Sequence, residues 1–233
     1  MGALRELYCD WNGSAPLCVA ARRRLEQALA EELGNPASLH RPGERGRIAL
    51  EQARAEVAAL FGADPSELVF TSGGTEANHL AIAGRFEGAP TTAHLVTTAI
   101  EHASVLAAAD RLAARGIAVT RVAPQRDGTV AVGDLLAAVT PMTRLVACMA
   151  ANNETGALMP IAELAAALRP LSIPLHVDAV QLLGRARLQA GAFGAATVSF
   201  SGHKLGGPAG GGALWIARGH ALAPWIGGGR QER

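Results

Sequence analysis

Short apolar runs alternate along this chain with longer segments in which apolar side chains recur at helical spacing. Six short strands are predicted, at residues 68–70, 95–97, 119–122, 145–149, 175–177 and 197–200. Apolar runs of this length, bounded by turn residues, are typical of buried strands. Strands that alternate with helices predict an α/β fold with a mostly parallel sheet and helices on both faces.

Proline and glycine residues mark the expected helix ends. A first helix is predicted to start at Pro16 and to stop at Gly34. A second runs through Ile48 and Val57 and ends at Gly62. Three further helices are expected to begin near residue 75, to span residues 105–115 with a glycine cap at 116, and to span residues 161–169.

Length and composition fit one large domain. The chain has 233 residues, of which 49% are hydrophobic and 18% charged, as in globular proteins. We expect an N-terminal segment at residues 1–15 and one large domain at residues 16–233. The net charge of +1 gives no indication of a nucleic acid or anionic lipid partner. The arginine run at residues 22–24 is read as a solvated helix face.

The cysteines and the apolar segments bear on location. Cys9, Cys18 and Cys148 follow neither a metal-binding spacing nor a disulfide framework. The first residues lack the apolar stretch of a signal peptide, and no stretch approaches the length of a membrane span. These features predict a reduced, cytoplasmic protein without a metal site.

The most informative pair of residues is Lys204 and Asp178. Each follows a predicted strand, and the carboxyl ends of parallel strands open into the ligand crevice of an α/β sheet. A pyridoxal phosphate enzyme needs a lysine amine to condense with the cofactor aldehyde. It also needs a carboxylate to keep the ring nitrogen protonated. Either residue alone would be read as a solvated loop residue or a helix cap.

A glycine-containing motif at residues 71–78 comes directly after the strand that ends at Phe70. Gly74 permits a tight turn, and the helix that starts near Thr75 offers free amides, a dipole and a hydroxyl to a phosphate group. The motif lacks the ending of a Walker loop and the spacing of a dinucleotide fingerprint. A glycine turn followed by a helix cap remains the alternative reading.

Other polar residues also follow predicted strands. His102 could stack on a cofactor ring and exchange protons, or serve only at a helix start. Asn153 could bind a ring hydroxyl or a substrate carboxylate, although loops often use asparagine for its turn geometry. Gln181 could reach the same ring hydroxyl. Ser201 and His203 flank the lysine and are placed to assist with the phosphate.

The order of these motifs resembles the cysteine desulfurases, which are pyridoxal phosphate enzymes of the class V aminotransferase branch. The matching segments are residues 8–12, 34–40, 70–76, 101–102, 152–156, 176–181, 199–204 and 227–233. The resemblance implies the large domain of an aspartate aminotransferase-like fold, known as fold type I of the pyridoxal phosphate enzymes. It also implies a homodimer, L-cysteine as substrate, and transfer of sulfur through an enzyme persulfide to iron–sulfur cluster or thio-cofactor assembly.

The resemblance implies a role for each candidate residue. Lys204 is the covalent cofactor anchor, Asp178 pairs with the ring nitrogen, and His102 stacks on the ring and transfers protons. Asn153 and Gln181 contact the hydroxyl side of the ring. The residues expected to hold the phosphate are Gly74, Thr75, Ser201 and His203.

Members of the family continue beyond the position of Arg233 into a smaller C-terminal domain that carries the sulfur-accepting cysteine. None of the three cysteines of this chain matches that position. We therefore expect the chain to lack the small domain and to be inactive in sulfur transfer by itself. The alternatives are a non-catalytic or split-enzyme domain completed by a partner chain, and a class V aminotransferase or cysteine lyase.

Overall fold

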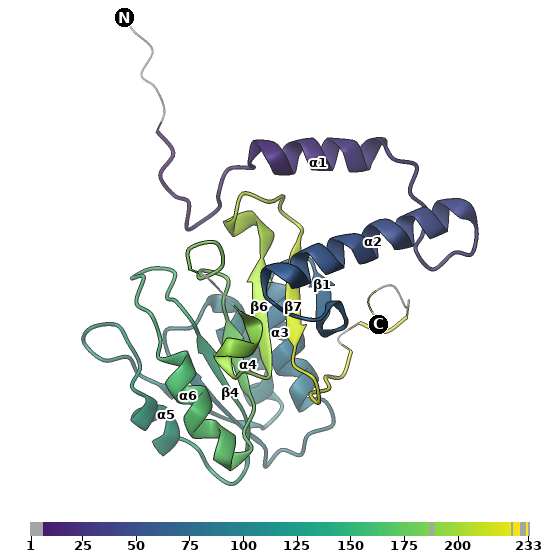
Figure 1. Cartoon of the computed structure of the whole chain (residues 1–233). Helices are drawn as coiled ribbons and strands as arrows, with labels where there is room; N and C mark the ends of the chain where they lie inside the picture. Colours follow the sequence, from purple (N-terminus) through teal and green to yellow (C-terminus); the bar gives the residue numbers. More distant parts are fainter. Residues whose placement is uncertain (1–6, 187–188, 225, 229–231, 233) are drawn as a thin grey trace, which may run out of the picture.

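The computed structural model describes residues 7–186, 189–224, 226–228 and 232. Within these residues one sheet has the strand order β1-β7-β6-β5-β4-β2-β3 (Figure 1). Its strands are β1 (Leu68–Thr71), β2 (His94–Thr98), β3 (Ala118–Val122), β4 (Thr143–Met149), β5 (Leu175–Asp178), β6 (Thr197–Ser201) and β7 (Gly212–Ile216).

The direction of the strands determines where the functional groups gather. β7 runs antiparallel to both of its neighbours, β1 and β6, while the pairs β6–β5, β5–β4, β4–β2 and β2–β3 are parallel. Every strand except β7 therefore points the same way. Their carboxyl ends lie along one edge of the sheet, and the prediction of a mostly parallel sheet is confirmed.

Helices cover both faces of the sheet, as predicted. The helices are α1 (Val19–Ala30), α2 (Arg41–Leu60), α3 (Gly74–Phe86), α4 (Ala103–Ala114), α5 (Val132–Ala137) and α6 (Ile161–Leu168). On β4, Leu145 and Ala147 pack into the apolar cluster of α3 and α4. Val146 and Cys148 face the opposite way, into the larger cluster that includes α5 and α6. This alternation follows from the two-residue period of a strand.

Two of the predicted helix ends are confirmed and those of the first helix are wrong. Gly62 and Gly116 follow α2 and α4 with φ of +60° and +82°, a backbone conformation that favours glycine. The first helix starts three residues after Pro16, because Cys18 is its N-cap and accepts a hydrogen bond from the Ala21 amide. Gly34 does not cap this helix; its amide instead donates to the carbonyl of Pro42.

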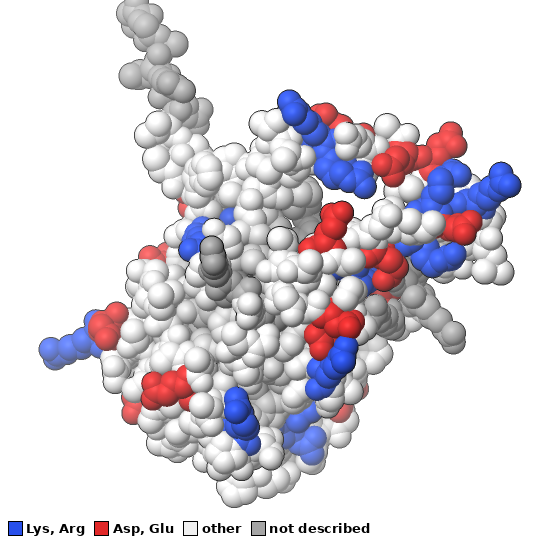
Figure 2. Space-filling view, in the orientation of Figure 1, with Lys and Arg blue, Asp and Glu red and all other residues white. Residues whose placement is uncertain are grey.

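Helix α1 has no buried residue, and Figure 1 shows it away from the sheet. The arginine side chains at residues 22–24 are exposed, which fits the expected solvated face. On the face shown in Figure 2, acidic and basic side chains are interspersed over α1 and α2. Of the helices that the structure describes, none combines the length and apolar character needed to cross a membrane.

Candidate active site

A cavity of about 620 Å³ opens at the edge of the sheet where the parallel strands end. The structure brings all nine predicted site residues to its wall. These are Gly74, Thr75, His102, Asn153, Asp178, Gln181, Ser201, His203 and Lys204. They come from the segments that follow β1, β2, β4, β5 and β6, so the sheet topology alone explains why residues spread over 130 positions converge.

Lys204 ends a short 3₁₀ turn, Gly202–Lys204, directly after β6. Its Nζ donates to the main-chain oxygens of Asn12, at 2.6 Å, and Gly13, at 2.8 Å. Partial burial lowers the pKa of Lys204, and the positive charge of Arg185 lowers it further. A lower pKa increases the fraction of neutral amine, the form that attacks an aldehyde. Lys204 is also the only lysine in the printed sequence.

Asp178 ends β5 and is 5% exposed. Its Oδ1 accepts a hydrogen bond from the Val180 amide at 3.0 Å, and its Oδ2 accepts one from Asn78 Nδ2 at 2.7 Å. Burial raises the pKa of Asp178, although these bonds and the positive charges nearby partly oppose the rise. A cation inside the cavity would favour the ionised carboxylate, so this environment suits an acid that pairs with a protonated ring nitrogen.

His102 is the N-cap of α4, and its Nδ1 accepts a hydrogen bond from the Ser104 amide at 3.1 Å. Asn153 donates from Nδ2 to the Glu154 carboxylate at 2.6 Å. Gln181 donates from Nε2 to the carbonyl of Asn12 at 3.1 Å. The side chains predicted to contact the ring are therefore held at the cavity wall by hydrogen bonds, of which that of Gln181 reaches Asn12 across 169 positions.

The start of α3 forms another part of the wall. Gly74 packs so close to Val180 that a Cβ there would lie 2.5 Å from Cγ2 of the valine. Glycine at this position therefore lets the helix start approach the loop after β5. Opposite it, Ser201 Oγ and His203 Nδ1 lie 2.9 Å apart. A helix N-terminus, the Thr75 hydroxyl and these two side chains together form a polar group set of the kind that binds phosphate.

The structure adds residues to the site to which the sequence assigned no role. Asp10, Asn12 and Gly13, from the irregular N-terminal segment, line the cavity, and so does Asn78 from α3. The segments that matched the family contained Asp10 and Asn12, but single side chains there gave no chemical signal. The Ala15 amide also donates to the carbonyl of His203. The proposed boundary at residues 15 and 16 remains a prediction.

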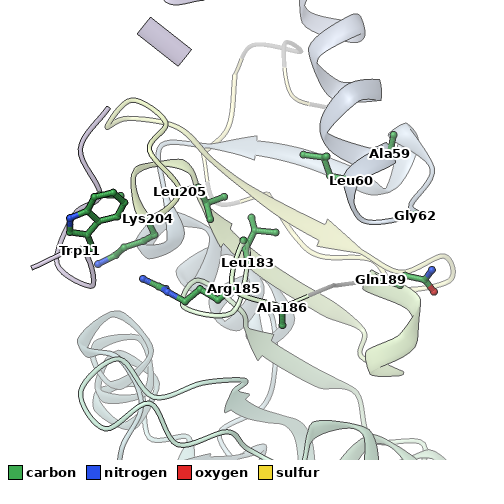
Figure 3. A pocket seen from close by; sticks show the side chains of 12 residues that line it. Trp11, Ala59, Leu60, Gly62, Leu183, Arg185, Ala186, Gln189, Lys204 and Leu205 are labelled. Carbon is green, nitrogen blue, oxygen red and sulfur yellow. The ribbon is translucent and has the colours of Figure 1, made fainter. Parts of the chain in front are cut away.

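An apolar groove of about 710 Å³ lies beside the cavity and shares Lys204 with it (Figure 3). Figure 3 shows the side chains of Trp11, Lys204 and Arg185 together at one end of this groove, with Leu60 of α2 across it. Trp11 is 56% exposed. The lysine thus lies between a polar cavity and an apolar surface.

The three cysteines lie in different environments. Cys148 is buried in β4, where burial raises the pKa of its thiol well above the usual value. Cys18 is exposed at the start of α1. Cys9 is exposed in the irregular segment and comes just before Asp10, which lines the cavity. Among the described residues, no group of side chains is arranged to hold a metal ion.

The comparisons with known proteins agree with this geometry. The aminotransferase class-V family profile matches residues 7–233, and the chain belongs to that family. It is 38% identical over 229 residues to a cysteine desulfurase IscS of Dictyoglomus turgidum, and 41% identical over 218 residues to a cysteine desulfurase of Mus musculus. These alignments cover 98% and 92% of this chain, but only 58% and 47% of the two relatives.

Solved structures are also similar. The structure of SspA in complex with cysteine superposes with a TM-score of 0.91 at 34% identity, over 96% of this chain and 66% of that chain. The match confirms the expected pyridoxal phosphate fold type I. In each of these three comparisons the chain spans less than two thirds of the length of the protein that it matches. The glycine-rich match at residues 227–233 lies largely outside the described residues, which include only positions 227, 228 and 232 of it.

Class V aminotransferases and cysteine desulfurases are pyridoxal phosphate enzymes. The residues of this cavity fit that cofactor. Lys204 supplies an amine of lowered pKa, and Asp178 supplies a buried acid. The start of α3, whose N-cap makes no side-chain hydrogen bond, supplies groups of the kind that bind phosphate.

Proposed function

We propose that this chain is the cofactor-binding part of a cysteine desulfurase, with Lys204 as the covalent anchor of pyridoxal phosphate. One observation carries the proposal: the only lysine of the sequence lines the same cavity as buried Asp178 and as His102. The identity to cysteine desulfurases supports L-cysteine as the substrate.

Each residue of the cavity then has a role. Bound pyridoxal phosphate supplies an aromatic ring that accepts electrons from bonds at the substrate Cα. With the cofactor bound, Asp178 would keep the ring nitrogen protonated and His102 would be the proton-transfer group. Asn153 and Gln181 would bind the ring hydroxyl. The cavity-lining residues that would bind the phosphate are Gly74, Thr75, Ser201 and His203.

The net reaction of the proposed enzyme is L-cysteine plus a protein thiol, giving L-alanine and a protein persulfide. The bond between Cβ and sulfur breaks, the sulfur joins the thiol sulfur, and Cβ gains a proton. The thiol of Cys148 is buried, and neither Cys9 nor Cys18 matches the position of the family's sulfur-accepting cysteine. We therefore propose that the acceptor thiol belongs to a longer form of this chain or to a separate protein.

Further features of the proposal extend beyond this length of chain. A homodimer, delivery of sulfur to iron–sulfur cluster or thio-cofactor assembly, and a cytoplasmic location are proposed by likeness to the family. Three free cysteines are consistent with a reducing compartment. For the chain as printed, the cavity supports cofactor binding and proton exchange at the substrate Cα without sulfur transfer.

Loading with pyridoxal phosphate followed by borohydride reduction and peptide mass spectrometry tests the proposal. We expect about one reduced cofactor per chain, attached to the peptide that contains Lys204. Lys204→Ala should lose the adduct and the near-visible absorbance band. Because the sequence holds a single lysine, a double variant, Lys204→Ala with Arg23→Lys, measures background labelling of an exposed amine on α1. An equal adduct yield on that surface lysine would contradict the proposal.

A further inference from the structure

A buried polar network lies beneath the cavity and centres on Asn78 of α3. Asn78 is 1% exposed, and its four partners, which come from three other elements, are also buried. These partners are Ser104 at 5%, His176 at 0%, Asp178 at 5% and Ser199 at 0% exposed. Buried polar groups are stable only when they are hydrogen-bonded, so the pairing within this network is strongly constrained.

The amide of Asn78 has one consistent orientation. Its Nδ2 lies 2.7 Å from Asp178 Oδ2 and 3.0 Å from Ser104 Oγ. Its Oδ1 lies 2.6 Å from Ser199 Oγ and 3.0 Å from His176 Nε2. An ionised carboxylate only accepts hydrogen bonds, so the NH₂ group must face Asp178. Both donors and both acceptor positions of the amide are then used.

This orientation fixes the proton on His176. Because Asn78 Oδ1 is an acceptor, His176 must donate to it from Nε2. Nδ1 of the same ring then accepts from the Thr197 hydroxyl at 2.9 Å. Burial lowers the pKa of His176 to about 3, which agrees with a neutral ring. His176 therefore supports Asn78 through a hydrogen bond donated to its Oδ1.

The orientation of Asn78 also determines which atom of His102 accepts a hydrogen bond, because Ser104 connects the two side chains. Ser104 Oγ accepts from Asn78, so its own hydrogen is free to point to His102 Nδ1, 2.8 Å away. The Ser104 amide also donates to that nitrogen at 3.1 Å. Nδ1 of His102 is thus an acceptor with two donors, and in the neutral ring the proton lies on Nε2.

We propose that Asn78 is a positioning residue that orients Asp178 directly and sets the tautomer of His102 through Ser104. This inference rests on the proposed function for the roles of Asp178 and His102. A single amide then couples two groups that come from β5 and from the start of α4. In the resting state the neutral His102 ring presents an N–H at Nε2, so its first action in the cavity is to donate a hydrogen bond.

The test is the tautomer of His102 in the cofactor-free chain, measured by long-range ¹H–¹⁵N correlation spectra of histidine-labelled protein. We expect the Nε2–H form in the unchanged chain. Asn78→Ala frees the Ser104 hydroxyl from its fixed role, so the ratio of Nδ1–H to Nε2–H should rise roughly three- to tenfold, as expected for one hydrogen bond. His94 bonds Thr143 and Thr120, apart from this network, so its signals are the internal control.

A double-mutant cycle of Asn78→Ala and Ser104→Ala separates an effect of Asn78 on the His102 tautomer from a general loss of structure. In the Ser104→Ala background, Asn78→Ala should leave the His102 tautomer ratio unchanged within twofold, because the connecting hydroxyl is absent. If Asn78→Ala does not fold, Ser104→Ala alone must still raise the Nδ1–H form. An unchanged ratio in every folded variant would overturn the inference. Because no cofactor is present, failure of the chain to bind pyridoxal phosphate would contradict the proposed function but leave this result intact.

Discussion

The Nζ atom of Lys204 lies 2.6 Å from the main-chain oxygen of Asn12, a residue 192 positions earlier in the sequence. The side chain of Asn12 accepts a hydrogen bond from Arg185 Nη2 at 2.8 Å, and its carbonyl also accepts one from Gln181. The N-terminal segment is therefore part of the site rather than an appendage. It holds the lysine amine at the boundary of the cavity and the apolar groove.

Replacing Asn12 by Ala tests this contact. The variant keeps the main-chain oxygen that binds Lys204 but removes the side-chain bond to Arg185, so the turn should lose its fixed position. We expect the cofactor Kd to rise about two- to tenfold, as for one partly exposed hydrogen bond. Titration of the cofactor absorbance measures it. Gln27→Ala, on the exposed face of α1, is the matched control, and equal affinities for the two variants would contradict the expectation.

The fold was largely predictable because its signals are local. Each of the six expected strands forms, and the largely buried strand β4 shows the mostly apolar run expected of a strand covered on both faces. β7 was not predicted, because it starts within a glycine-rich stretch that reads as a loop. Its stability comes from pairing with both β1 and β6, which a local pattern does not show.

Asp178→Asn should separate chemistry from cofactor loading. An asparagine keeps the shape of the side chain but cannot hold a proton on a ring nitrogen, and removing the partner of a buried cation costs about 3–5 kcal/mol. We expect α-proton exchange of L-alanine in D₂O to slow by about two orders of magnitude or more. Loading should weaken far less. Asp110→Asn, at an exposed position of α4, serves as the control. Equal losses of loading and exchange would instead indicate a folding defect.

Glu101 predicts a pH dependence of stability. It is 6% exposed; its Oε1 accepts from Thr98 Oγ1 and the Met149 amide, while its Oε2 has no hydrogen-bond partner among the described residues. Burial raises the pKa of Glu101 to about 8 from a usual value of 4.5. Between these values the folded state keeps a proton that the unfolded state has lost. The contribution of Glu101 to stability is therefore present below pH 4.5 and is lost as the pH rises to about 8.

Glu101→Gln removes this titration while keeping an acceptor for Thr98 and Met149. The free energy of unfolding of the variant should fall less between pH 5 and pH 8, by on the order of a few kcal/mol. Urea denaturation at several pH values measures the difference. Glu163→Gln, on the exposed face of α6, should follow the unchanged chain. A Glu101→Gln profile parallel to the unchanged one would show that Glu101 does not titrate in this range.

An ion pair between Arg54 and Glu232 anchors Glu232 to helix α2. Arg54 is 1% exposed and donates to both carboxylate oxygens of Glu232, at 3.0 and 2.7 Å, while Glu232 also accepts from the Phe70 amide. Glu232→Gln should lower the free energy of unfolding by about 1.5–3 kcal/mol. Glu51 also pairs with Arg54 but is half exposed, so Glu51→Gln should cost less than about 1 kcal/mol. Equal effects in urea denaturation would contradict this ranking.

The site was predictable only in part, for a physical reason. Lys204, Asp178 and His102 follow strands, and the topology of a parallel sheet brings strand ends together. Asn78 contacts Asp178 across 100 residues of sequence, and Asn12 contacts Lys204 across 192. Such pairings depend on how α3 and the N-terminal segment pack, which no spacing in the sequence encodes. The single lysine was visible in the sequence and makes the assignment of the anchor testable without competing lysine side chains.

The last prediction is that this chain by itself does not release sulfide from L-cysteine at a useful rate. Sulfur transfer needs an activated thiolate placed against the substrate sulfur, and such placement commonly contributes several kcal/mol to catalysis. Cys148 is buried with a raised pKa, and Cys18 is the N-cap of α1. Of the three cysteines, Cys9 is the one whose variant tests this prediction most directly, because it is exposed and adjacent in sequence to Asp10 of the cavity wall.

Sulfide and alanine production by the cofactor-loaded chain, with excess dithiol as reductant, measures this activity. We expect values close to those of Lys204→Ala, and no change in Cys9→Ser, Cys18→Ser or Cys148→Ser. A cysteine from another chain should restore turnover if it can reach the cavity. Robust turnover that only Cys9→Ser abolishes would make Cys9 the acceptor and would show that this length of chain is sufficient for sulfur transfer.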